Sequence, residues 1–144
     1  MCIRDRVERG VPVCAHIGLT PQSVHQLGGY KVQGRTEDSV ERLKREARAL
    51  EQAGAALLVL EMVTRGVATD ITAATIDMAT IGIGAGPETH GQVLVLHDLI
   101  GVFPGKRPRF AKDFVGGTRT VEQAIRAYVD DVKAARFPAP EHCY

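Results

Sequence analysis

Residues 55–63, AALLVLEMV, form an apolar run in which Glu61 is the one ionisable side chain. The apolar residues follow one another without alternating with polar ones, which is typical of a parallel strand covered on both faces. Successive parallel strands need a crossover connection, usually a helix. This stretch therefore predicts an α/β protein in which helices and strands alternate along the chain.

The segments on either side of this run follow that alternation. Apolar runs ended by glycine, proline or polar residues predict four strands, over residues 11–19, 55–63, 80–85 and 93–100. Helical spacing of apolar residues and capping signals predict three helices: one from the cap Thr36 to the stop Gly54, one over residues 64–76, and one from the capping box of Thr120 and Gln123 to Pro138. Residues 101–117 are rich in Gly, Pro and basic residues and are predicted to be irregular.

Composition and charge exclude several classes of protein. Of the 144 residues, 44% are hydrophobic and 24% charged, which excludes a disordered or fibrous chain. The net charge of +1 provides no overall field that would attract nucleic acid or an anionic membrane, and no apolar run approaches the about 20 residues that cross a bilayer. The 3 cysteines are odd in number and widely spaced, which favours reduced thiols. We expect a cytoplasmic protein that binds neither nucleic acid nor membranes.

The polar residues at the predicted strand ends are the candidate functional residues, because parallel α/β proteins carry their sites at the carboxyl ends of the strands. Glu61 ends an apolar strand, and desolvation there would raise its pKa toward the range of a general base. Pairing with a neighbouring Arg or Lys is the alternative. His16, Gly84 and His97 are possible walls of the same pocket, although a histidine at a strand end more often makes a purely structural hydrogen bond.

Three further patterns are weak. The glycines of residues 82–86 lack the spacing of a dinucleotide-binding loop, because Pro87 stands where the third glycine would be, so a tight turn is favoured. The adjacent pair His142 and Cys143 lacks the ligand spacing of a zinc site. The basic stretch over residues 106–112 contains one aromatic residue and is interpreted as a solvated loop.

Five stretches of the sequence resemble one known family, the ketopantoate hydroxymethyltransferases. They are VPVCAHIGLTPQSVHQLGGYKVQGRT (11–36), LLVLEMV (57–63), TIGIGAGPETHGQVLVLHD (80–98), PRFAKDF (108–114) and FPAPEH (137–142). The family fold is a (β/α)8 TIM barrel of the phosphoenolpyruvate/pyruvate superfamily. The resemblance implies that residues 7–144 are its C-terminal half, about four β/α units. Residues 1–6 match nothing in the family and are expected not to be part of the native domain.

The resemblance also implies a reaction and its participants. A hydroxymethyl group passes from 5,10-methylenetetrahydrofolate to the keto acid 3-methyl-2-oxobutanoate, giving 2-dehydropantoate for pantothenate synthesis. Mg²⁺ holds the keto acid, and the glutamate of the LVLE motif, Glu61 here, removes the proton at C3. The family's magnesium ligands precede residue 7, so no metal ligand is expected in this chain, and we expect the chain to be inactive by itself. Complete members are homo-oligomers.

Two other functions stay open at this point. A half barrel exposes two sheet edges, which favours a non-catalytic module that associates with itself. A related carbon–carbon lyase of the same superfamily would share the architecture and differ in the keto acid that it binds.

Overall fold

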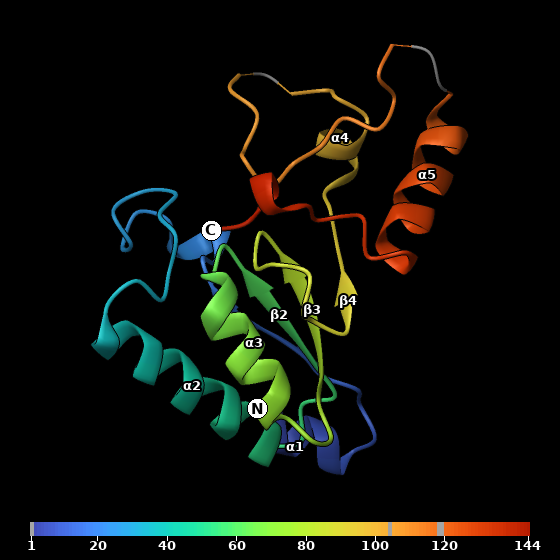
Figure 1. The fold of residues 1–144 in the computed structure, drawn as a ribbon. Helices are drawn as coiled ribbons and strands as arrows, with labels where there is room; N and C mark the ends of the chain where they lie inside the picture. The colour runs from blue at the N-terminus through green and yellow to red at the C-terminus, as the bar shows by residue number, and fades with distance from the viewer. Residues whose placement is uncertain (1, 104, 118–119) are drawn as a thin grey trace.

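The computed structural model describes residues 2–103, 105–117 and 120–144. Its sheet has four strands in the order of the chain, β1 (Cys14–Gly18), β2 (Leu57–Glu61), β3 (Ala79–Ile83) and β4 (Gly91–Gln92). Every neighbouring pair of strands is parallel, so the carboxyl ends of all four strands lie at the same end of the sheet (Figure 1). The α/β architecture predicted from the sequence is confirmed.

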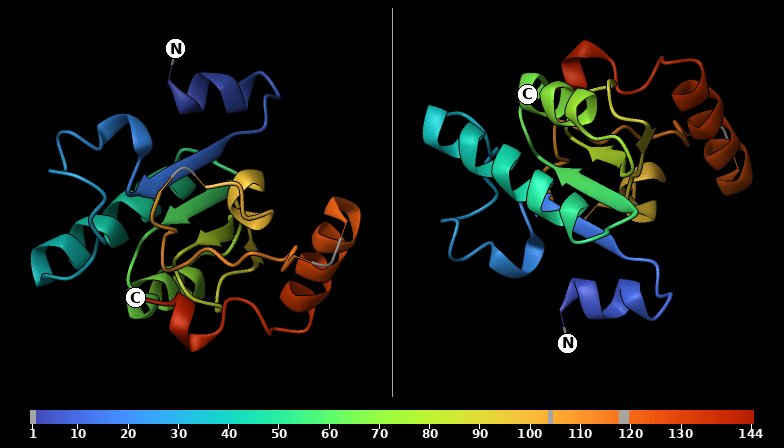
Figure 2. Two further views of the ribbon diagram at one scale, coloured as in Figure 1. Left: turned by 90° about the horizontal axis from the view of Figure 1, so that it is seen from above. Right: turned by 90° about the horizontal axis from the view of Figure 1, so that it is seen from below.

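Two of the predicted helices cover one face of this sheet (Figures 1 and 2). The first, α2 (Glu37–Gln52), begins at the predicted cap, where the hydroxyl of Thr36 accepts a hydrogen bond from the amide of Ser39. The second, α3 (Arg65–Ala74), follows β2. The remaining helical segments are α1 (Ile3–Glu8), η1 (Pro21–Ser23), α4 (Leu96–Leu99), α5 (Val121–Lys133) and η2 (Pro140–His142). Within the described residues, no helix is long and apolar enough to cross a membrane.

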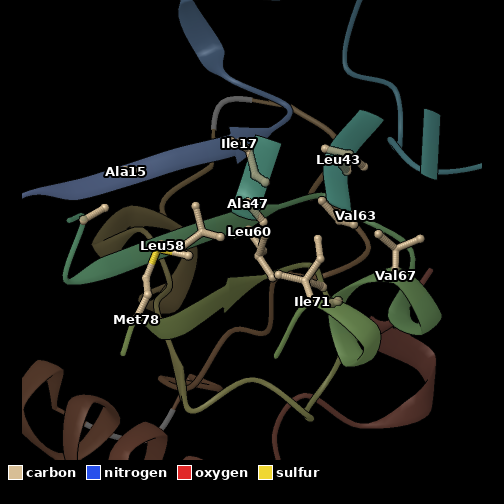
Figure 3. Close-up of a cluster of buried hydrophobic side chains, with 13 residues drawn as sticks. Ala15, Ile17, Leu43, Ala47, Leu58, Leu60, Val63, Val67, Ile71 and Met78 are labelled. Atoms are coloured by element: carbon tan, nitrogen blue, oxygen red, sulfur yellow. The ribbon is translucent and has the colours of Figure 1, made fainter. Parts of the chain in front are cut away.

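The main core lies between the sheet and the pair α2 and α3 (Figure 3). Leu58 and Leu60 are fully buried, whereas their neighbour Leu57 is exposed. Burial along β2 therefore alternates, and the expectation that both of its faces are covered is only partly correct. The side chains that fill this core come from β1, β2, α2, α3 and the segment between β2 and α3: Ala15, Ile17, Leu43, Ala47, Leu58, Leu60, Val63, Val67, Ala68 and Ile71.

A second apolar cluster joins α4, α5 and the C-terminal segment. Its centre is Phe114, whose ring packs edge-on against Tyr128 at 5.5 Å and against Phe137 at 5.4 Å between ring centroids. Such edge-to-face pairs add to the burial of aromatic area. The helix α5 opens with the predicted capping box, in which Thr120 and Gln123 exchange two hydrogen bonds.

The strand predicted over residues 93–100 is wrong. Only Gly91 and Gln92 pair with β3, and the short helix α4 follows at residue 96. Asp98 and Leu99 are adjacent and both buried in α4, whereas the side chains of a strand alternate between its two faces. The apolar sequence VLVL suggested a buried strand, but Val95 is 51% exposed.

At Gly18, the last residue of β1, the backbone lies very close to the backbone of Glu61 in β2. Its φ is +94°, and an added Cβ would overlap the carbonyl oxygen of Glu61 and lie 2.7 Å from Cγ2 of Val63. The next residue, Leu19, donates its amide to that same carbonyl at 2.9 Å. Only glycine fits here, because both the backbone conformation and the lack of space exclude a side chain.

We expect Gly18→Ala to destabilise the protein more than Gly29→Ala. Gly29 has a similar positive φ of +108° but no atom within 4 Å of an added Cβ, so its substitution costs only the conformational strain, about 1–2 kcal/mol. At Gly18 the overlap with Glu61 and Val63 adds about 1–3 kcal/mol. Urea denaturation of the two variants measures both free energies of unfolding. Equal losses would contradict the close packing of β1 on β2.

Candidate functional site

Glu61 and His16 meet on the face of the sheet opposite α2 and α3. Gly18 pairs with Glu61 and His16 with Val59 in the parallel register of β1 and β2. Positions two residues apart on a strand share a face. His16 therefore points to the same face as Glu61, from the position on β1 that pairs two residues before Glu61. The two side chains are in contact, with 3.0 Å between Nε2 of His16 and Oε2 of Glu61.

The environment of Glu61 favours its protonated form. Its side chain is 15% exposed and that of His16 is 32% exposed. Burial raises the pKa of Glu61 above its ordinary value, and the nearby His16, by its charge and its hydrogen bond, offsets part of that rise. The ion pair with Arg or Lys that the sequence left open is not what the structure shows, since the partner of Glu61 is a histidine. A carboxylate in this setting accepts a proton more readily than one in water.

The residue after Glu61 is held in an unusual backbone conformation. Met62 has a φ of +47°, which is uncommon for a residue with a side chain. Its amide donates to the carbonyl of Ile83 and its carbonyl accepts from the amide of Gln33, both at 2.8 Å. Strain of this kind gathers at functional sites and persists where the surroundings hold it in place. No sequence pattern predicted the positive φ of Met62, whose backbone hydrogen bonds are made to β3 and to a loop far away in the chain.

The other predicted pocket residues occupy different positions. Gly84 is buried in a turn with a φ of +64°, and an added Cβ would lie 3.0 Å from the ring of Phe110. The tight turn favoured from the sequence is therefore confirmed. His97 lies in α4 with its side chain exposed, and the described residues show no contact between His97 and Glu61. Of the four candidates, the structure brings together only Glu61 and His16.

The described residues show no cluster of metal-binding side chains. Within residues 2–103, 105–117 and 120–144, no group of three or more His, Cys, Asp or Glu side chains could hold a metal ion. Mg²⁺ prefers octahedral oxygen ligands, whereas the neighbour of Glu61 is an imidazole. The pair His142 and Cys143 is bonded to its own turn, since Nδ1 of His142 accepts from the amide of Ala139 and Sγ of Cys143 donates to the carbonyl of Ala139.

Sequence reasoning did not single out Asp98 as a site residue. Asp98 lies within the strand predicted over residues 93–100, whereas the structure places it in α4 with 7% of its surface exposed. Burial raises the pKa of its carboxyl group, and His97 offsets part of that rise. The signal that could have identified Asp98 is a carboxylate at the end of an apolar run, the same signal that identified Glu61.

The fold and the site define an α/β protein of parallel β/α units with a largely buried carboxylate at the end of a strand. The family model for ketopantoate hydroxymethyltransferase matches residues 1–140. The chain therefore belongs to the ketopantoate hydroxymethyltransferase family. The matched range includes residues 1–6, and the boundary predicted at residue 7 falls within α1.

Several curated relatives carry the name 3-methyl-2-oxobutanoate hydroxymethyltransferase. The protein of Azoarcus sp. is 66% identical over 142 residues, that of Aromatoleum aromaticum is 61% identical, and enzyme 1 of Burkholderia ambifaria is 59% identical. Each match covers 99% of this chain and 52% of the relative. The chain thus spans about half the length of the curated relatives that it matches.

We expect His16→Ala to raise the pKa of Glu61 further. In the native protein His16 lowers this pKa against the effect of burial, so its removal leaves desolvation unopposed and moves the titration of Glu61 to higher pH. Carbon NMR of a chain labelled at the glutamate carboxyl groups measures the shift. His25→Ala, at an exposed loop position, is the control and should leave the titration of Glu61 unchanged. An unchanged or lower pKa of Glu61 in His16→Ala would contradict the contact.

Proposed function

We propose that this chain supplies the general base of a 3-methyl-2-oxobutanoate hydroxymethyltransferase. The complete protein would transfer a hydroxymethyl group from 5,10-methylenetetrahydrofolate to 3-methyl-2-oxobutanoate, consuming water and releasing 2-dehydropantoate and tetrahydrofolate. The observation that carries this proposal is the largely buried carboxylate of Glu61 at the end of β2, in contact with His16. The names of the relatives support the reaction and the substrates.

Formation of the new carbon–carbon bond requires a carbanion at C3 of the keto acid. Oε of Glu61 accepts the proton from C3, and the electron pair left on C3 then attacks the one-carbon unit of the folate. A base works best when its pKa lies near the working pH, and the raised pKa of Glu61 moves it in that direction. His16 acts as a positioning residue, because its bond to Oε2 orients the carboxylate.

The magnesium ion and the homo-oligomer implied by the resemblance stay predictions. We expect the ligands for Mg²⁺ to come from the part of the relatives that this chain does not span, because the donors around Glu61 do not suit that ion. For the same reason we expect the 144-residue chain by itself to lack activity.

Exchange of the C3 proton of 3-methyl-2-oxobutanoate in heavy water, followed by proton NMR, tests the role of Glu61. The chain is fused to the part of the Azoarcus relative that it does not span. In this fusion we expect Glu61→Gln to slow exchange by about 10²–10⁴-fold, because the amide cannot accept the proton. Glu46→Gln, on the exposed side of α2, is the matched control and should exchange at the native rate.

Exchange that persists in Glu61→Gln at the native rate would overturn the assignment of the base. The 144-residue chain without the fused part should show no exchange. If the unfused chain does exchange C3 and loses this activity in Glu61→Gln, the base is supported and the expected inactivity is wrong.

A self-associating module is the second candidate function. The strands β1 and β4 each have one neighbour in the sheet, and Val93, Val95 and Leu96 near β4 are exposed. Unpaired edges and exposed apolar side chains both promote association. We expect the isolated chain to form oligomers whose size rises with concentration, measured by sedimentation. A monodisperse monomer with cooperative thermal unfolding would exclude this candidate.

A further inference from the structure

The carboxyl group of Glu61 has to lose a proton in every catalytic cycle. In the proposed function it accepts the proton of C3, and it cannot act as a base again until that proton has left. Only 15% of its side chain is exposed, and a keto acid whose C3 contacts the carboxylate would cover part of that surface. A protein group that takes the proton from Glu61 would return it to its reactive form.

The surroundings of Glu61 offer a single proton acceptor. In the sheet, Glu61 pairs with Gly18 on one side and with Ile83 on the other, and the residues directly before and after it in the chain are apolar. Nε2 of His16 lies 3.0 Å from Oε2 of Glu61. In the part of the chain that the structure describes, no other side chain makes an ion pair or a hydrogen bond with this carboxylate. A proton that leaves Glu61 for a protein group therefore goes to His16.

The imidazole of His16 has a second nitrogen that is free to exchange protons with water. Among residues 2–103, 105–117 and 120–144, no hydrogen bond to Nδ1 of His16 is found. The side chain of His16 is also the more exposed of the two, at 32% against 15% for Glu61. An imidazole accepts a proton on one nitrogen and releases a proton from the other. The ring thus connects the carboxylate with water.

We propose that His16 relays the C3 proton from Glu61 to water, in addition to orienting the carboxylate. The proposal rests on the proposed function, in which Glu61 is the base. The O–H bond of the protonated carboxyl group breaks, and its proton forms an N–H bond at the unprotonated Nε2, which leaves a carboxylate beside an imidazolium. The imidazolium then releases its Nδ1 proton to water. The departing tetrahydrofolate takes up a proton from water, so the overall proton count is unchanged.

Two properties of the pair suit this transfer. In water an imidazole is a stronger base than a glutamate carboxylate by about 2 pKa units, and burial raises the pKa of Glu61, which narrows the difference and keeps the transfer reversible. A neutral imidazole carries its one proton on either nitrogen. With the proton on Nδ1, His16 accepts from Glu61. With the proton on Nε2, it donates to the carboxylate and orients it, and exchange with water at Nδ1 interconverts the two forms.

Deuterium loss from C3, compared with product formation, tests the relay in the fusion to the Azoarcus part. The keto acid carries deuterium at C3, the solvent is ordinary water, and NMR follows both the unreacted keto acid and 2-dehydropantoate. Without the relay, the deuterium stays on Glu61 and returns to C3. We expect His16→Gln to lower the ratio of deuterium lost to product formed by about tenfold or more, because an amide orients the carboxylate but does not pass on a proton. His25→Gln, at an exposed loop position, is the matched control and should keep the native ratio.

A native ratio in His16→Gln, with deuterium loss and product formation lowered equally, would overturn the relay and leave His16 only its orienting role. Deuterium loss at the native rate in Glu61→Gln would instead overturn the base, and the relay with it, so the two failures are distinguishable. His16→Ala provides a second variant if His16→Gln does not fold. Added imidazole should restore its ratio, and equal restoration by acetamide, which forms hydrogen bonds but does not carry a proton, would overturn the relay.

Discussion

The parallel register between β1 and β2 is the constraint on which the site depends. It pairs Gly18 with Glu61, and the close approach of the two backbones at this point is possible only because Gly18 has no side chain. A shift by one residue would move Glu61 to the face packed against α2 and α3. There the carboxylate would lie among Leu43, Val63 and Val67 without His16.

The two faces of the sheet carry different kinds of side chain. The face under α2 and α3 is filled with aliphatic side chains and contributes most of the packing (Figure 3). The opposite face carries His16 and Glu61, whose desolvation would be a cost in a purely structural role. Met62 adds a positive φ directly after Glu61. Unfavourable features of this kind are tolerated at functional sites because the surrounding structure holds them.

The sequence predicted correctly the helices whose first turn is fixed by residues close to it in the chain. The cap of α2 at Thr36 and the capping box of α5 are contacts across three positions, and both were predicted correctly. The conformation of residues 93–100 was predicted wrongly, because a short apolar run is equally compatible with a strand and with a helix. Its conformation depends on burying Asp98 and Leu99 in a cluster built from distant segments.

The sequence by itself determined the alternation of helices and strands and the family, and it singled out Glu61 as the candidate proton acceptor. Periodicity, capping and motif residues act over short stretches of chain, so they can be recognised without coordinates. Only the tertiary structure decided that His16 is the partner of Glu61, that Met62 has a positive φ, and that Asp98 lies in a helix. A pKa and a hydrogen-bond partner depend on strand register and burial, which join residues far apart in the chain.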